Sequence, residues 1–493
     1  MKRRSLLALL VWFASAQVAF GAPSPTAFRR DMDAFVARLS RTPGAPPGFV
    51  VVAVTGNSTL YEHAGGMRDA DRGAPMTLDT PIYNASTTKA YTGLLAAILD
   101  EKGVLPLNTR LDQAWPEAQL GAGVGDVAAS RLLSHTSGLS EGGLVFRSVY
   151  TGQITATETP RQLARYVQRG PSEFRYSNFG PFVYSAMAEA RTGLTWRDLL
   201  AREVLSPLKL RHSSARLEDF PVGDVARCHS RRGQGGWTPL ALKPTAALNA
   251  AGGMYTSGRD TGRFLQIFLR GEAAAEGAIP ARTLRRTWRK EAPQSATFNG
   301  LSRDGYGLGW DLGEYEGWRY VSRSGGYVGC RSIALFIPEL DIGVAVLSVG
   351  DTGANSFNVA LVQQALDLWR GDPRATERGA QRIADGARSA SAIAQADSQW
   401  RAALDRTKGD PVPAGLAGSY RHPRLGELVV VSGAHGLILH AGVFKADLLP
   451  LGGDEVLLVS QALADPAPVR FSRTATGSIS ALQWDDDRFE RIQ

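Results

Sequence analysis

The chain is poor in the residues that build metal sites and disulfides. Its 493 residues include two cysteines and seven histidines, and the histidines form no His-Glu-x-x-His or other clustered ligand pattern, so we predict no metal and no cofactor. Cys228 and Cys330 lie far apart in the sequence, which says nothing of their distance in space. We expect two buried free thiols, with a disulfide as the alternative if the protein is exported.

The chain also lacks a strong excess of one charge. The formal net charge is +8, and three of the positive charges are Lys2, Arg3 and Arg4 at the extreme N-terminus. So modest an excess does not indicate a nucleic-acid partner. The densest basic stretch, residues 282–290, is predicted as one helix with a solvated face.

No apolar stretch in the chain reaches the length of a membrane span. The longest, residues 6–20, is interrupted by Ser15 and Gln17 and follows the basic N-terminus. Together with small residues at positions 19 and 21, this pattern predicts a signal peptide cleaved after Gly21. We therefore expect a periplasmic or secreted protein with no stable membrane span.

The length allows more than one domain. Residues 22–370 are predicted as one α/β domain, in which strand-like runs at both ends and helices between them indicate an antiparallel sheet flanked by helices, with a helical subdomain. Residues 371–414 are predicted as a linker with a helical middle, and residues 415–493 as a small all-β barrel. The expected strands are 49–54, 58–63, 309–312, 318–322, 332–336 and 342–349, then 427–432, 436–440, 444–449, 455–460, 469–473 and 480–484, with a closing helix of the first domain at 355–370.

Ser86 and Lys89 are the most informative residues of the chain. They lie three apart at the start of an apolar helical run that ends at Gly103, so both face the same side of the helix. A serine nucleophile would there contact a lysine base, beside helix N-terminal amides that stabilise an oxyanion. Ser206 and Lys209 have the same spacing, but no sustained helical pattern follows them.

Tyr176-Ser177-Asn178 is the second candidate element. A tyrosine beside a lysine loses its proton more readily, so Tyr176 would act as a base toward Ser86 and as an acid toward the leaving group. The amide of Asn178 would donate to a substrate carbonyl or hold Lys89 in place. Taken alone, the tripeptide is more typical of a turn.

Arg323-Ser324-Gly325-Gly326 is the third candidate element, at the end of a predicted strand. A glycine pair lets the backbone approach a ligand closely, so Arg323, Ser324 and Gly325 are predicted to bind substrate, with Arg323 gripping a carboxylate. The N–H groups of Ser86 and Gly326 would form the oxyanion hole. His135, a single histidine in the run 132–139, is more typical of a structural role than of a catalytic one.

Five features, which follow one another along the chain in the family's order, resemble the penicillin-recognising serine hydrolases. The resemblance is to the branch of class C β-lactamases, D-alanyl-D-alanine carboxypeptidases, D-aminopeptidases and β-lactamase-like esterases. The features are Ser86 with Lys89, the run Leu132–Leu139, Tyr176 with Asn178, Ala251-Gly252-Gly253-Met254, and Gly305-Tyr306-Gly307-Leu308-Gly309-Trp310. The resemblance covers about residues 30–370.

The resemblance implies an α/β fold of the β-lactamase and transpeptidase type. It implies that Ser86 is the acylated nucleophile, that Lys89 and Tyr176 share the base work, and that Asn178 helps to bind substrate. Whether Lys89 or Tyr176 takes the proton of Ser86 stays open. The C-terminal segment resembles the lipocalin-like modules of some related hydrolases.

Arg323 departs from the family, which usually has lysine or histidine at that position. Arginine keeps a positive charge but does not exchange a proton at neutral pH. We therefore expect an exported serine hydrolase that cleaves an ester, a D-peptide-like amide or a β-lactam, with an esterase or D-amino-acid peptidase favoured over an efficient β-lactamase. The alternative is a non-catalytic, penicillin-binding-like protein that holds a small or peptide-like ligand in the same pocket.

Overall fold

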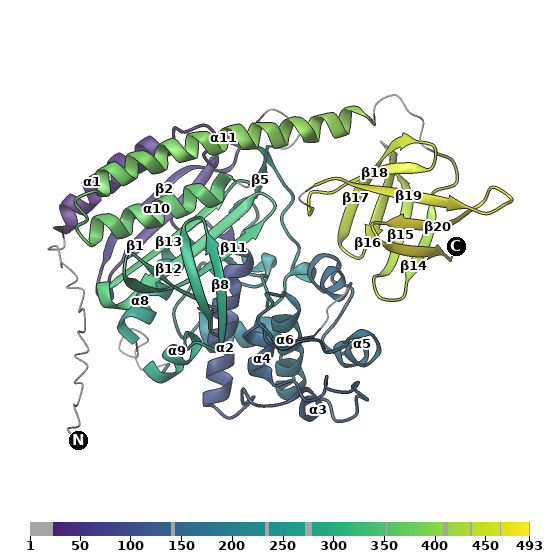
Figure 1. The fold of residues 1–493 in the computed structure, drawn as a ribbon, viewed down its shortest axis with the longest axis horizontal. Coiled ribbons are helices and arrows are strands. Elements are labelled where there is room, and N and C mark those ends of the chain that lie inside the picture. Colours follow the sequence, from purple (N-terminus) through teal and green to yellow (C-terminus); the bar gives the residue numbers. More distant parts are fainter. Residues whose placement is uncertain are drawn as a thin grey trace, which may run out of the picture.

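The structure is a computed structural model that describes residues 23–492, except 140–142, 232–235, 272–278, 352, 408–412, 434–435 and 464. The predicted signal peptide and its cleavage point lie outside the described residues. Two bodies lie side by side, and one long helix runs from the first toward the second (Figure 1). Within the described residues, no helix is long and apolar enough to cross a membrane.

An antiparallel sheet of nine strands, counted over the described residues, forms the centre of the first body. The two ends of the domain meet in it, because β1 (Gly48–Val54) pairs with β13 (Ile342–Val349). The spatial order is β3-β2-β1-β13-β12-β11-β10-β9-β8. The other bounds are β2 Thr59–Asp69, β3 Ala74–Pro75, β8 Ala292–Phe298, β9 Leu301–Tyr306, β10 Asp311–Tyr315, β11 Trp318–Tyr327 and β12 Cys330–Ile337.

Helices cover both faces of the sheet, which explains why β1 and β13 are almost continuously apolar. Val50 and Val52 belong to the core that contains α8 (Gly258–Arg270), and Phe49 and Val51 belong to the core that contains α1 and α10. Figure 1 shows α1 and α10 stacked on one face and α8 on the other. These helices span Pro25–Leu39 for α1 and Gly353–Trp369 for α10.

A further group of helices accompanies α2 (Thr88–Glu101), which is buried from Thr88 to Leu99. Together with the sheet they form the predicted fold class, which the structure confirms. Their bounds are α3 Leu111–Ala114, α4 Ala129–Leu133, α5 Thr159–Tyr166, α6 Phe179–Thr192, α7 Trp196–Leu200 and α9 Ala281–Thr287, with π-helical turns η2 Phe146–Thr151 and η3 Ala201–Leu205, 3-10 turns η1 Ala85–Thr87, η4 Leu217–Asp219, η5 Thr245–Ala247 and η7 Pro338–Leu340, and the small pairs β4 Ile82–Tyr83 with β7 Tyr255–Thr256 and β5 His229–Ser230 with β6 Thr238–Pro239.

The second body is a closed antiparallel barrel of eight strands, counted over the described residues, and it follows the helix α11 (Ala375–Asp405). Six of these strands match predicted ones. The two that close the barrel, β14 and β21, were not predicted, because their sequences GSYRH and DRFER each offer only one buried residue. The bounds are β14 Gly418–His422, β15 Gly426–Gly433, β16 Gly436–Ala441, β17 Phe444–Gly452, β18 Glu455–Val459, β19 Ala467–Arg473, β20 Ile479–Trp484 and β21 Asp487–Arg491.

Two other predictions differ from the structure. The sheet edge formed by β8 and β9 was not predicted, because β8 is largely exposed and β9 has three polar residues in a row at its centre. The helix predicted at 282–290 ends at Thr287, where the chain turns back toward β8.

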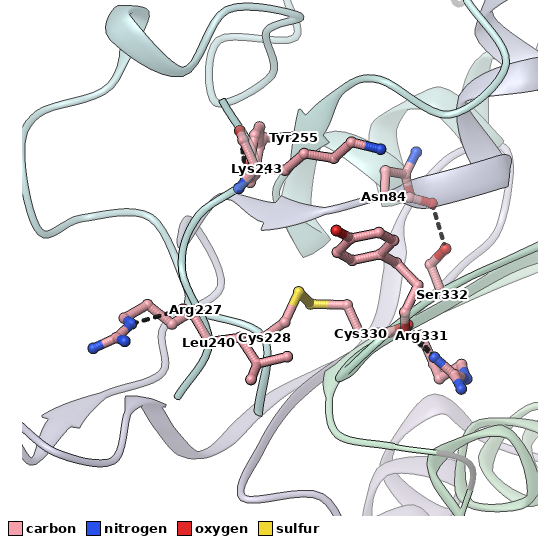
Figure 2. The surroundings of a disulfide bond; sticks show 10 residues. Asn84, Arg227, Cys228, Leu240, Lys243, Tyr255, Cys330, Arg331 and Ser332 are labelled. Carbon is pink, nitrogen blue, oxygen red and sulfur yellow. Dashed lines mark hydrogen bonds between the residues drawn. A yellow bond between two sulfur atoms is a disulfide. The ribbon is translucent and has the colours of Figure 1, made fainter. Parts of the chain in front are cut away.

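The expectation of two free thiols is wrong, because Cys228 and Cys330 form a disulfide (Figure 2). They are 102 residues apart in sequence, but their Cα atoms are 5.0 Å apart. Cys330 begins β12, and the backbone N–H of His229 donates to the carbonyl of Gly329 at 3.0 Å. Nothing in the sequence near either cysteine indicates that the two residues come together in the fold.

Candidate active site

Ser86 lies in the 3-10 turn that leads into α2, and Lys89 lies in the first turn of that helix. The Nζ of Lys89 is 3.2 Å from the Oγ of Ser86 and donates to it. Ser86 is partly exposed, whereas Lys89 is buried. At the alternative pair, Lys209 adopts a positive φ of 57°, so Ser206 and Lys209 do not share a helical face.

Lys89 is held by three acceptors. Besides Ser86, its Nζ donates to the Oδ1 of Asn178 at 2.7 Å and to the carbonyl of Ala251 at 2.6 Å. Burial, opposed by Tyr176 and aided by the charge of Arg323, lowers the pKa of Lys89 to about 8. Sequence reasoning missed the carbonyl of Ala251, and its only signal was the glycine-rich run 251–254.

Tyr176 points its hydroxyl group into the same cluster, although the residue as a whole is 43% exposed. The hydroxyl donates to the Oγ of Ser86 at 2.9 Å and accepts from the Nη2 of Arg323 at 2.6 Å. Burial raises the pKa of Tyr176, but the charges of Arg323 and Lys89, with hydrogen bonds to Lys89 and Ser86, outweigh it and lower the pKa to about 8. A tyrosine in this setting reaches the phenolate form far more easily than a free one.

Arg323 is buried behind Tyr176, and each nitrogen of its guanidinium has a protein acceptor. Nη1 donates to the carboxylate of Asp311 at 3.1 Å, Nε to the carbonyl of Ser86 at 3.1 Å, and Nη2 to Tyr176. This differs from the predicted clamp on a substrate carboxylate, because only 4% of the residue is exposed. The geometry instead favours an action of Arg323 through Tyr176.

His135 supports the segment that carries Tyr176. Its Nδ1 accepts from the backbone N–H of Ser177 at 3.3 Å, and its Nε2 lies 3.1 Å from the hydroxyl of Tyr306. Burial, followed by the charges of Lys89 and Arg323, lowers the pKa of His135 well below its usual value. The neutral ring therefore carries its proton on Nε2, and His135 acts as a positioning residue.

Strand β11 passes directly against the turn of Ser86. A Cβ atom added to Gly325 would lie 2.4 Å from the carbonyl oxygen of Asn84 and 2.9 Å from the backbone nitrogen of Ser86. Only glycine permits this approach, which brings the segment of Gly325 and Gly326 beside the amide of Ser86. The neighbouring Ser324 accepts from the Nη2 of Arg303 at 3.0 Å.

The glycine-rich run 305–310 has a packing role. Gly309 has a φ of +93°, and a Cβ atom there would lie 2.1 Å from the carbonyl oxygen of Lys89. The run therefore presses against the first turn of α2, where it fixes the helix that carries Lys89. Tyr306, in the same run, contacts His135 as described above.

Within the described residues, no group of three or more histidine, cysteine, aspartate and glutamate side chains is arranged to hold a metal ion.

The family model for Beta-lactamase matches residues 29–367. The chain belongs to the Beta-lactamase family. This is a family of serine hydrolases.

Two curated relatives and one solved structure are similar to the chain. Penicillin-binding protein 4 of Amycolatopsis lactamdurans is 27% identical over 66% of this chain and 86% of its own length. Unguisins hydrolase ungD' of Aspergillus campestris is 25% identical over 65% of this chain, but the match spans only 62% of that relative. The octameric penicillin-binding protein homologue from Pyrococcus abyssi has a TM-score of 0.60 and 19% identity over 93% of this chain and 99% of its own, which shows a shared fold that includes the C-terminal barrel.

Proposed function

We propose that this member of the Beta-lactamase family is an exported hydrolase that forms an acyl-enzyme on Ser86 and cleaves an ester or a D-peptide-like amide. The observation that carries the proposal is the double contact of the Ser86 Oγ, with the Nζ of Lys89 at 3.2 Å and the hydroxyl of Tyr176 at 2.9 Å. A nucleophile in hydrogen-bond contact with a base, itself held by a third group, is the arrangement that covalent catalysis requires.

In this proposal Tyr176 is the group that carries the proton. As the Oγ of Ser86 bonds to the carbonyl carbon of the substrate, its proton passes to the Tyr176 phenolate, and the N–H groups of Ser86 and Gly326 bind the oxyanion. Tyr176 then gives the proton to the leaving group as the scissile bond breaks. Water attacks the acyl-enzyme by the same route in reverse, and the Oγ of Ser86 recovers its proton.

Lys89 remains an ammonium in this scheme. Three acceptors around its Nζ favour the charged form, and its charge stabilises the phenolate of Tyr176. Because Asn178 uses its Oδ1 on Lys89, its amide N–H₂ stays available to donate to a substrate carbonyl. Arg323 adds a second fixed charge and no titrating proton.

The substrate class rests on two supports. One is the position of Arg323, where the resembled family usually has lysine or histidine, which favours an ester or D-peptide substrate over a β-lactam. The other is the pair of relatives, one named as a penicillin-binding protein and one as a hydrolase of unguisins. A β-lactam remains a substrate that the same acylation step would accept slowly.

Export is supported by the predicted signal peptide and by the disulfide, because disulfides persist in oxidising compartments.

We retain the predicted division into a signal peptide to residue 21, a hydrolase domain to 370, a linker to 414 and a barrel module to 493. Sequencing the N-terminus of the mature protein from its host tests the cleavage after Gly21.

The decisive experiment is covalent labelling. The purified protein is incubated with a fluorescent penicillin or with a neutral active-site phosphonate, and the adduct is located by intact-mass and peptide mass spectrometry. We expect one adduct on Ser86, none in Ser86→Ala, and unchanged labelling in Ser206→Ala, which removes the serine of the same spacing elsewhere. Labelling that persists in Ser86→Ala contradicts the nucleophile assignment, and a wild-type protein that neither labels nor turns over esters and D-peptides is the non-catalytic binder.

A further inference from the structure

A cavity of about 740 Å³ lies between the hydrolase body and the barrel. Tyr150, Lys243 and Tyr327 line it from the hydrolase side, and Phe444, Lys445 and Asp447 line it from the barrel. The site described above does not use these residues.

Direct contacts fix the two walls of this cavity against each other. The backbone N–H of Val443 donates to the carbonyl of Thr151 at 3.0 Å, and the N–H of Ala241 donates to the Oε1 of Gln461 at 2.8 Å. The ring of Phe146 packs 5.4 Å from that of Phe444, measured between centroids. The space is therefore formed by docked surfaces, as ligand cavities generally are.

Lys243 is the unusual residue of this cavity. Its side chain is buried, with 8% of the residue exposed, and among the described residues its Nζ has no hydrogen-bond acceptor and no acidic partner. Its neighbours are aromatic rings, with the Nζ 4.9 Å from the ring centroid of Tyr327 and 5.5 Å from those of Tyr83 and Tyr150. Burial lowers the pKa of Lys243 to about 7. A buried ammonium without a counter-ion is costly, and such groups concentrate at functional sites.

The segment that carries Lys243 is held firmly. Its backbone N–H donates to the hydroxyl of Tyr255, and that hydroxyl donates to the Lys243 carbonyl, both at 3.1 Å. The N–H of Leu240 donates to the carbonyl of Cys228 at 2.7 Å, next to the disulfide. Figure 2 shows the Lys243 side chain extended from this segment toward Asn84. The backbone that carries the ammonium is thus held in place before a ligand binds, which lowers the entropic cost of binding.

The lysine also lies close in the fold to the Ser86 turn. Tyr327 directly follows Gly326, and Tyr83 stands three residues before Ser86. Asn84 directly follows Tyr83, and its buried side-chain amide has no hydrogen-bond partner among the described residues. Tyr327, which lines the cavity, is therefore the direct chain neighbour of Gly326 in the proposed oxyanion hole.

We propose that this cavity receives the part of the substrate remote from the scissile bond, and that Lys243 binds a carboxylate of that part. A carboxylate supplies the counter-ion that the ammonium lacks, whereas a neutral group would leave the charge unpaired. The inference rests on the proposed function and makes the preferred substrate an acidic acyl or peptide-like compound.

The test compares matched 4-nitrophenyl esters of increasing chain length that end in either a carboxylate or a carboxamide. We expect wild-type kcat/KM to favour the carboxylate by roughly tenfold at the matching length, since a hydrogen bond between two charged groups is stronger than one between a charged and a neutral group. Lys243→Met should reduce this ratio to about 1, mainly through KM. Lys243→Arg, which keeps the cation, should retain a preference.

Lys445→Met is the matched control, because Lys445 lines the same cavity from the barrel and is exposed. It should keep the carboxylate preference. A wild-type protein without the preference, or a preference that Lys445→Met abolishes and Lys243→Met retains, overturns the proposal. Labelling of Ser86 by the neutral phosphonate separates the two proposals, because its absence in the wild type refutes the hydrolase, while its presence without a carboxylate preference refutes only the role of Lys243.

Discussion

The chain buries two lysines near Ser86 and surrounds them in opposite ways. Lys89 has three oxygen acceptors and two charged or chargeable neighbours in Tyr176 and Arg323. The Nζ of Lys243 has no hydrogen-bond acceptor among the residues that the structure describes, and it lies over the rings of three tyrosines. Burial lowers the pKa of both, to about 8 and about 7.

The comparison separates two uses of a buried cation. At Lys89 the protein itself supplies the partners, so the charge keeps Tyr176 and Ser86 reactive. At Lys243 the faces of the rings give only weak compensation, so the charge remains available to a ligand. The surroundings of Lys89 would therefore support the reaction with any substrate, whereas those of Lys243 would determine which substrates are preferred.

Removal of Lys89 should have the largest effect. Lys89→Met takes away the cation beside Tyr176 and a hydrogen bond to Ser86, so we expect acylation by the neutral phosphonate to slow by about 10³-fold, in the range of general-base losses. Stopped labelling reactions resolved by intact mass measure the rate. Lys243→Met is the comparison, and an equal loss in both variants would erase the distinction between the two lysines.

Loss of the disulfide should come next. In the double variant Cys228→Ser/Cys330→Ser, the free energy of unfolding should fall by about 2–5 kcal/mol, because the bond closes a long loop. Urea unfolding followed by tryptophan fluorescence measures it. We also expect the carboxylate preference to weaken, since the bond anchors the segment of Lys243. A double variant that unfolds at the same urea concentration as the wild type would contradict the predicted loss of stability.

Arg323 should set the pH dependence. In the wild type, activity should rise with pH until the pair of Tyr176 and Lys89 has lost one proton, near pH 8. Arg323→Met removes a cation that lowers the pKa of Tyr176, so the rise should move to higher pH. At pH 7, kcat/KM should then fall about tenfold for each pH unit by which the rise moves.

The charged and titratable groups around the phenol include His135, Tyr306 and Asp311, so a matched variant is needed. Asp311→Asn leaves Arg323 in place but removes its counter-charge, and should move the rise in the opposite direction. Profiles of kcat/KM for a neutral ester check both variants. An unmoved profile in Arg323→Met would show that Arg323 does not act on the proton carrier.

Removal of one aromatic ring beside Lys243 should give the smallest effect. Tyr150→Leu removes one aromatic face, and cation–π contacts contribute about 0.5–2 kcal/mol, so the carboxylate-to-carboxamide ratio should change by only a few-fold. Tyr150→Phe keeps the face and should leave the ratio as it is. A Phe variant that behaves like the Leu variant would point to the hydroxyl instead.

The sequence predicted what local spacing encodes. Ser86 and Lys89 are three residues apart at the start of one helix, and β1 and β13 are apolar runs because both of their faces are buried. Tyr176 and Asn178 were found through their order in a family pattern. The fold class follows from the same signals, although β8, β14 and β21 have too few buried residues to be predicted and β9 is interrupted by three polar residues in a row.

What the sequence did not predict depends on contacts between distant segments. The carbonyl of Ala251 is a backbone group, to which any residue type would contribute. The partner of Arg323 is Asp311, an ordinary acid in the sequence until β10 and β11 pair. Lys243 resembles a surface lysine in sequence, because the four tyrosines near it come from four separate segments.

The disulfide also closes a ring in the chain that contains some of the residues of the two proposed sites and leaves others outside it. The chain between Cys228 and Cys330 is a closed ring, which contains Lys243, Arg323 and Gly326. The nucleophile and the proton carrier, Ser86 and Tyr176, lie outside it. A single proteolytic cut within the ring would release no fragment, and the nicked protein would migrate as one chain without reductant and as two with it. The residues that surround the substrate would thus stay tethered to one another after a break that, in a reduced chain, would free them.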